Sequence, residues 1–312
     1  MRPASSAAIR LAMMILLAAA VAFCSSVSAR ELIESRESTY NNIYVHKDGP
    51  IYAMSFGHNR RFYTETIYDS RDELVLPVVY TRFMTAGLAY LGKPASSLLE
   101  IGFGGGRTAW YLHKHFPDLD ITSVELDPEV LELAIKYFGV SNQENFDVQV
   151  ADGRRYMQRQ TDRRWDIIMV DAYRGPFVPF HLLTTEFYAL AKRRLSDGGV
   201  LVQNVEPTTM VFEAALKTVG SVFANVDLYP AQGNVVMVAY DGPSLPRDIL
   251  LQRAEAVTKS ADLRYPLQDM LAERRIVNRL PETPALTDDF APVESLLAIE
   301  RHNRKLDDYA KP

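Results

Sequence analysis

The stretch Ser97–Trp110, SLLEIGFGGGRTAW, has the pattern of a buried strand that breaks into a glycine-rich turn and leads into a helix. Gly102, Gly104 and Gly106 allow the backbone to turn tightly and to approach a ligand, and the helix start offers free N–H groups. With Glu100 the spacing is E-x-G-x-G-x-G, whereas dinucleotide-binding turns have G-x-G-x-x-G. The stretch therefore favours an adenosyl-sulfonium ligand over NAD, with a plain strand-to-helix turn as the alternative.

The rest of the chain alternates between patterns typical of strands and of helices. Residues 30–72 predict a small N-terminal β meander with strands near 40–46, 51–56 and 61–67. Residues 73–245 predict a Rossmann-like α/β domain, because strands separated by helices form right-handed crossovers and a mainly parallel sheet. We expect its strands near 97–102, 120–125, 146–151, 165–171, 198–203, 224–229 and 234–240, the last two antiparallel. We expect helices near 72–91, 106–116, 127–138, 153–159, 183–194 and 208–222, then a C-terminal helical extension over 246–312 with helices near 246–260 and 266–278.

The first 29 residues have the pattern of a secretory signal peptide. Arg2 and Arg10 precede the apolar run 11–23, and Val-Ser-Ala29 is a small-x-small cleavage site. We therefore expect export, to the periplasm, with an uncleaved membrane anchor as the alternative. Cleavage would remove Cys24, the only cysteine, so we expect no disulfide, no catalytic thiol and no cysteine metal site, and we assign no metal ligands.

Length and charge limit the class of partner. The chain has 312 residues, enough for a substantial core, and a formal net charge of −5. A mildly acidic protein of this kind lacks the basic surface that nucleic-acid binding requires.

Acidic residues stand at the ends of three predicted strands, where a doubly wound sheet binds its ligand. Glu125 is spaced to accept both ribose hydroxyls, and an N-cap role is the alternative. Asp152, before Gly153, is placed to accept from an adenine amino group, unless Asp-Gly is only a turn. Asp171 would lie beside the reactive sulfonium and hold an incoming amine or orient the donor, unless it only bonds loop backbone. His181 is the one histidine near this edge of the sheet, and we expect it to be structural.

These motifs together resemble the spermidine synthase family, the polyamine aminopropyltransferases. The resemblance covers most of residues 35–240 and rests on the segments 37–45 (ESTYNNIYV), 63–65 (YTE), 101–106, 124–127 (VELD) and 152–153. It implies a class I S-adenosylmethionine-dependent methyltransferase-like Rossmann fold with a small N-terminal β domain. It further implies decarboxylated S-adenosylmethionine as co-substrate without a prosthetic group, a small amine oriented by Asp171 and Tyr63, and a homodimer through the β domain.

The chain departs from the family at residues that recognise cations. Gly105 stands where the family loop has Asp, and Arg174 stands where the family has a second Asp that assists deprotonation of the amine. In compensation, we expect Asp288 or Asp289 of a late Leu-Thr-Asp-Asp segment to face the pocket, with a helix-capping role as the alternative.

Two other functions remain open at this stage. One is a methyltransferase that uses ordinary S-adenosylmethionine, whose carboxylate Arg107 would pair with. The other is a catalytically silent, exported protein that binds polyamines or nucleosides.

Overall fold

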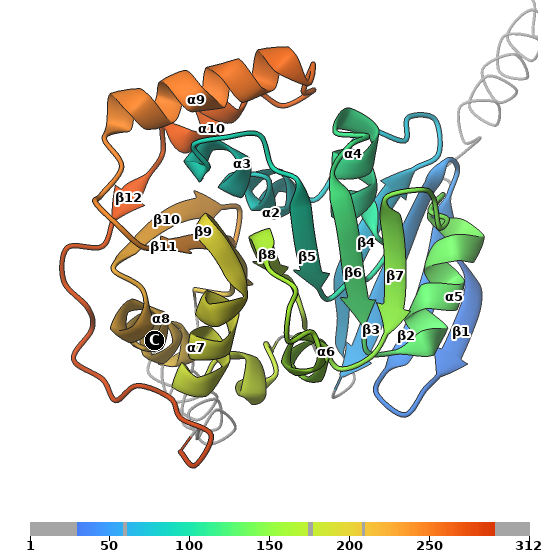
Figure 1. Cartoon of the computed structure of the whole chain (residues 1–312). Helices are drawn as coiled ribbons and strands as arrows, with labels where there is room; N and C mark the ends of the chain where they lie inside the picture. Colours follow the sequence, from blue (N-terminus) through green and yellow to red (C-terminus); the bar gives the residue numbers. More distant parts are fainter. Residues whose placement is uncertain (1–29, 59–60, 174–176, 208–209, 291–312) are drawn as a thin grey trace, which may run out of the picture.

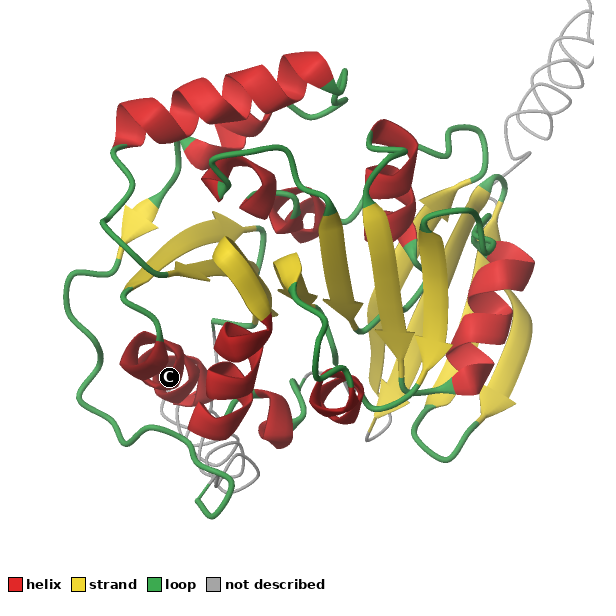
Figure 2. Cartoon of the chain, in the orientation of Figure 1, coloured by secondary structure: helices red, strands yellow, loops and turns green. Residues whose placement is uncertain are grey.

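The computed structural model of the chain describes residues 30–58, 61–173, 177–207 and 210–290. The expected signal peptide, Arg174 and the last residues from 291 on lie outside this part. The described chain forms two β-sheets, with helices on both faces of the larger one (Figures 1 and 2). No helix of the described residues is long and apolar enough to span a bilayer, and these residues contain no cluster of three or more His, Cys, Asp or Glu suited to a metal ion.

The N-terminal sheet is an antiparallel meander with one strand more than the sequence predicts. Its strands follow chain order: β1 (Glu31–Glu37), β2 (Asn42–Asp48), β3 (Ile51–His58) and β4 (Arg61–Asp69). The additional strand is β1, whose sequence ELIESRE lacks apolar alternation and is held by its pairing with β2.

The larger sheet has eight strands in the order β12-β10-β11-β9-β8-β5-β6-β7. The five strands from β9 to β7 are parallel, and β10 and β11 continue the sheet as the expected antiparallel pair. The strands are β5 (Ser97–Ile101), β6 (Asp120–Glu125), β7 (Phe146–Val150), β8 (Trp165–Val170), β9 (Leu195–Val205), β10 (Asn225–Ala231), β11 (Asn234–Tyr240) and β12 (Arg275–Ile276).

Two apolar clusters cover the faces of this sheet. One is formed with α2 (Val79–Met84), α3 (Gly87–Tyr90), α4 (Arg107–His115), α9 (Arg247–Ser260) and α10 (Leu267–Leu271). The other is formed with α6 (Gly153–Arg159), α7 (Thr185–Arg194) and α8 (Met210–Val222). The helix α5 (Pro128–Tyr137) instead packs its apolar side against β2 and β3 of the N-terminal sheet.

Two expected helices differ from the prediction. The stretch 72–91 is not one helix: residues before Val79 are turn and coil, because Pro77 disfavours helical backbone at the residue before it, and α2 and α3 follow as short helices. The stretch 266–278 is helical only over α10, and Arg275–Ile276 then pairs with β10. The C-terminal extension is therefore not purely helical, since it adds an edge strand to the main sheet.

A buried ion pair fixes this extension to the sheet. The Arg274 guanidinium lies 2.7 Å from the Asp227 carboxylate on β10, with side-chain exposures of 2% and 1%. The Tyr90 hydroxyl also donates to Asp227, at 2.7 Å. The pair anchors the chain after α10, from where it runs on to Phe290.

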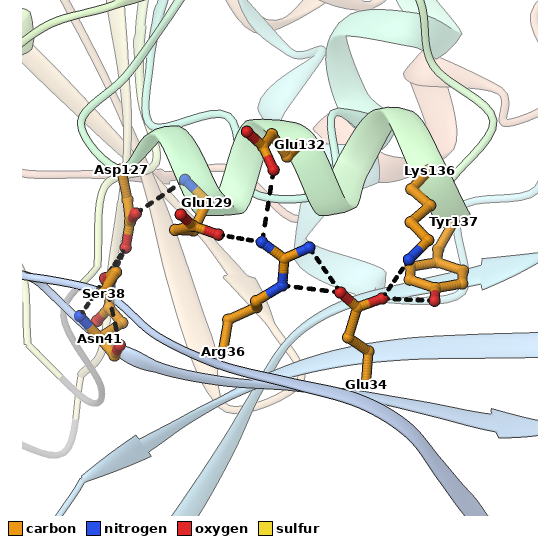
Figure 3. A network of polar contacts seen from close by, with 9 residues as sticks. All are labelled: Glu34, Arg36, Ser38, Asn41, Asp127, Glu129, Glu132, Lys136 and Tyr137. Atoms are coloured by element: carbon orange, nitrogen blue, oxygen red, sulfur yellow. Dashed lines mark hydrogen bonds and ion pairs between the residues drawn. The ribbon is translucent and has the colours of Figure 1, made fainter.

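A polar network joins the N-terminal sheet to α5 (Figure 3). Arg36 on β1 contacts Glu34 and Glu129, and Glu34 accepts from Lys136 and Tyr137. The hydrogen bond from Lys136 is the largest cause that lowers the pKa of Glu34 to about 2.

The same interface fixes the loop after β1. Asp127 caps α5 by accepting from the Glu129 N–H at 3.1 Å, and it also accepts from the Ser38 hydroxyl at 2.5 Å and the Asn41 side chain at 3.3 Å (Figure 3). The loop 38–41 is thereby held against the carboxyl end of β6.

Candidate functional site

A cavity of about 1090 Å³ lies between the two sheets, at the carboxyl ends of the parallel strands. This is the edge where a doubly wound sheet binds its ligand. The wall is built from loop 40–41, β4, the segment before α2, the glycine loop, the ends of β6, β7 and β8, and residues 177–182. Its position agrees with the expectation from the acids at the strand ends.

The glycine loop has the backbone that only glycine adopts easily. Gly102, Gly104 and Gly106 have φ of 91°, 54° and 68°, and Gly106 is the N-cap of α4. A Cβ atom on Gly102 would lie 2.5 Å from the Asp171 carbonyl oxygen. The loop therefore passes directly against the end of β8, and Gly102 and Gly104 line the cavity.

Glu125 lines the cavity and also shapes the glycine loop. One carboxylate oxygen accepts from the N–H groups of Phe103 and Gly104 at 3.0 and 3.1 Å, and the other accepts from Asp127 N–H at 3.0 Å. Burial raises the pKa of Glu125 against these hydrogen bonds. Ribose hydroxyls would have to share this carboxylate with the loop.

Asp152 and His181 form a pair on the cavity wall. Asp152 caps α6 by accepting from Arg155 N–H, and its other oxygen lies 2.8 Å from His181 Nε2. The hydrogen bond with His181 is the largest cause that lowers the pKa of Asp152. A Cβ atom on Gly153 would lie 2.3 Å from Ile101 Cγ2, so the start of α6 packs directly on β5.

Asp171 follows β8, lines the cavity and is held by two side chains that sequence reasoning missed. The Asn204 side chain donates to it at 2.9 Å and is itself oriented by Asn234 at 3.0 Å. The Tyr80 hydroxyl also hydrogen-bonds to it. Burial raises the pKa of Asp171 to about 6, against both hydrogen bonds.

Two further carboxyl groups lie in the same wall. Burial raises the pKa of Glu65 to about 8, with Asp171 and Glu125 adding to the effect. Glu100, whose carboxylate accepts from Ser123 at 2.6 Å, is likewise raised to about 8 by burial. Glu65 belongs to the 63–65 motif, but the sequence pattern does not predict a role for it.

The structure does not bring Tyr63 to this wall. Tyr63 is half-buried opposite Phe56 and is not one of the residues that line the cavity. The pairing of β4 with β3 shifts after Thr64, so that Glu65 is an extra residue and the side chain at the wall. A tyrosine hydroxyl does reach Asp171, but it belongs to Tyr80.

The late acidic segment lies at the rim and is already paired. Asp288 lines the cavity, but both of its oxygens lie within 2.7 Å of the Arg154 guanidinium, and Thr184 donates to it at 2.8 Å. Asp289 is exposed and does not line the cavity. A free replacement carboxylate from this segment is therefore not present.

Arg107, expected to pair with a ligand carboxylate, is engaged elsewhere. Its guanidinium donates to the carbonyl oxygens of Phe138 and Glu73 and stacks on Tyr68 at 4.5 Å. Burial lowers its pKa to about 10.

The described wall is thus strongly acidic. Its basic residues are Arg107 and His181, whereas its acids are Glu65, Glu100, Glu125, Asp127, Asp152, Asp171 and Asp288. Several of these acids are buried, so the charge that complements this site is a cation.

Comparison of sequences identifies relatives that match most of the chain. The pattern of the spermine/spermidine synthase domain matches residues 79–232. A polyamine aminopropyltransferase of Vibrio vulnificus is 31% identical over 286 residues, which cover 87% of this chain and 93% of the relative.

Comparison of structures supports the fold. A probable spermidine synthase from Corynebacterium glutamicum superposes with a TM-score of 0.63 at 20% identity, covering 82% of this chain and 99% of that one. Human methyltransferase-like protein 13, in complex with SAH, gives 0.54 at 27% identity, covering 59% of this chain and 92% of that one. The predicted methyltransferase-like Rossmann fold with a small N-terminal β domain is confirmed.

Proposed function

This chain belongs to the spermine/spermidine synthase family, and we propose that it is an aminopropyltransferase that uses decarboxylated S-adenosylmethionine and a small amine. The observation that carries the proposal is the buried acidic wall facing the glycine loop. Both substrates of such a reaction are cations, and a bound cation favours the ionised forms of buried acids such as Asp171 and Glu65.

The chain's own residues divide the work between binding and chemistry. The glycine loop, Glu125 and Asp152 hold the nucleoside, and Asp171 holds the acceptor amine. The amine nitrogen attacks the methylene carbon on the positive sulfur, so a C–N bond forms while the C–S bond breaks. The bonding electron pair neutralises the sulfur and methylthioadenosine leaves, while the proton of the amine passes to Asp171.

The environment of Asp171 suits it to accept this proton. With a pKa of about 6 it is mostly ionised at neutral pH, yet more basic than an ordinary Asp. Asn204 and Tyr80 fix the orientation of Asp171. The reaction requires this, because the amine must attack in line with the C–S bond that breaks.

The test is mass spectrometry for methylthioadenosine after mixing the full chain with decarboxylated S-adenosylmethionine and a panel of polyamines. We expect amine-dependent release in the native protein and a loss of about 10²- to 10⁴-fold in Asp171→Asn. Asp289 is exposed and does not line the cavity, so Asp289→Asn is the matched control and should keep the native rate.

Other products would contradict the proposal in distinct ways. Release of S-adenosylhomocysteine from ordinary S-adenosylmethionine would show a methyltransferase. Thermal stabilisation by the nucleoside without any product would show a silent binding protein.

We also propose that the protein is exported. The N-terminal pattern of residues 1–29 supports this proposal, and amino-terminal sequencing of the cellular protein tests it. A mature chain that begins at Arg30 in the periplasmic fraction is expected, and an intact Met1 in the membrane fraction would show the anchored alternative.

We further propose a homodimer through the N-terminal sheet. Its edge strands β1 and β4 support this, because edges present unpaired backbone groups for a second chain. Light scattering of the purified protein should give twice the chain mass, and a monomer mass would refute the proposal.

A further inference from the structure

The cavity wall contains a carboxyl group that the described residues leave without a partner. Glu65 lines the cavity, and its Oε1 atom is buried and accepts no hydrogen bond from the described residues. A buried polar atom without a partner costs free energy, so such an atom in a binding cavity points to a group supplied by the ligand.

The local backbone places this side chain at the cavity. In the β3–β4 pairing Met54 lies opposite Thr66 and Ser55 opposite Thr64, which leaves Glu65 as the extra residue of a bulge. Bulges re-aim side chains, and they are frequent next to active sites. The strand would otherwise place Glu65 in the regular alternation of β4.

Thr66, the residue after Glu65, holds β4 against the glycine loop. The Thr66 hydroxyl accepts from Gly105 N–H at 2.9 Å, and a Cβ atom on Gly105 would lie 2.3 Å from Thr66 Cγ2. Residues 104 and 105 of the loop are glycines and carry no side chain, and Glu65 is the ionisable residue that precedes Thr66 on the facing strand.

The groups around Glu65 make it a receptor for positive charge. Burial and then the charges of Asp171 and Glu125 raise the pKa of Glu65. Among the described residues, the phenols of Tyr80 and Tyr173 also interact with Glu65. Of the two basic residues of the described wall, Arg107 is held by backbone carbonyls and His181 is paired with Asp152.

We propose that Glu65 selects the decarboxylated donor, by binding the terminal ammonium group of its aminopropyl chain and repelling the carboxylate that ordinary S-adenosylmethionine carries. The inference rests on the proposed function, because it names the residue that distinguishes the two donors at the same site. Glu65 lies beside the glycine loop, where the nucleoside is held, which leaves Asp171 for the acceptor amine.

The experiment measures the binding of each donor to the full chain by calorimetry, without an acceptor. Glu65→Gln keeps the shape of the side chain and removes its charge. We expect the affinity for the decarboxylated donor to fall by about 10- to 100-fold and that for ordinary S-adenosylmethionine to stay or rise. A merely structural role would weaken both donors alike.

Two variants complete the design. Glu65→Asp retains a carboxylate and should retain the preference for the decarboxylated donor. Glu31→Gln, at an exposed site on β1 away from the cavity, removes one acid of the same sheet and should leave both affinities unchanged. In the native protein the preference should increase between pH 6 and pH 9 as Glu65 ionises, a measurement that needs no variant.

The outcomes separate the two proposals. A Glu65→Gln protein that keeps its preference, or a native preference that does not change with pH, overturns the role of Glu65 even when methylthioadenosine is released. Donor binding that depends on Glu65, without methylthioadenosine from any amine, supports the role of Glu65 and refutes the proposed reaction.

Discussion

Gly105→Ala tests whether Thr66 leaves room for a side chain at position 105 of the glycine loop. Gly105 does not have a positive φ, so alanine meets no backbone strain there. The added Cβ would instead lie 2.3 Å from Thr66 Cγ2 and 2.9 Å from Thr66 Cβ, distances that force one of the two segments to move.

The expected cost follows from these contacts. Overpacking of a buried site costs about 1–3 kcal/mol, and displacement of Thr66 also breaks its hydrogen bond with Gly105 N–H, worth about 1 kcal/mol. We therefore expect Gly105→Ala to lower the free energy of unfolding by about 2–4 kcal/mol.

Urea unfolding of the native protein and four variants measures this effect. Gly105→Ala is compared with Thr66→Ala and with the double variant, in which the 2.3 Å contact is absent and the 2.9 Å contact with the Cβ atom of residue 66 remains. We expect the double variant to be at least about 1 kcal/mol more stable than the sum of the single effects predicts. Gly92→Ala is the control, since its Cβ meets only Arg253 at 3.8 Å and should change stability little. Additive effects of the two substitutions would refute the steric explanation.

Two other predictions concern stability. The folded state holds a proton on Glu65 up to about pH 8, whereas the usual pKa of Glu is 4.5. The unfolding free energy of the native protein should therefore fall relative to that of Glu65→Gln as pH rises from about 5 to 8, by at most about 1.4 kcal/mol per pH unit. Equal pH dependence of the two proteins in urea unfolding would contradict this. Asp227→Asn leaves Arg274 buried without its ion partner and should lower the free energy of unfolding by about 3–5 kcal/mol. Glu255→Gln breaks an exposed pair and should lower it by less than about 0.5 kcal/mol. Comparable losses in urea unfolding would show that burial does not determine the contribution of these ion pairs to stability.

The parallel core of the fold could be predicted because its strands are apolar and its helices amphipathic. β6, for example, has the predicted bounds, since nothing but local pattern is needed to recognise it. β1 and β12 could not be predicted in the same way, because each is a strand only through its pairing with a neighbour. The helical period of 72–91 predicts one helix, but Pro77 restricts the backbone before it and α2 begins only at Val79.

Some residues of the site could be predicted from the strand pattern and others could not. Glu125, Asp152 and Asp171 were found because parallel strands end at one edge, and Asn204, near the end of β9, was accessible to the same reasoning. Glu65 was not accessible, because a bulge is a property of how two strands pair and leaves no trace in the sequence of one of them.

The raised pKa values of the cavity explain how so many acids share one wall. Glu65 and Glu100, with pKa values of about 8, are mostly protonated at neutral pH in the empty protein, so their repulsion with Asp171 and Glu125 is avoided. A bound cation favours the ionised forms, because it supplies the opposite charge that burial withholds. Binding then exchanges protons for the ligand's charge, and the affinity for a cationic ligand must rise with pH up to about 8. A neutral ligand of the same shape gains nothing from this exchange, so these raised pKa values favour a cationic ligand over a neutral one.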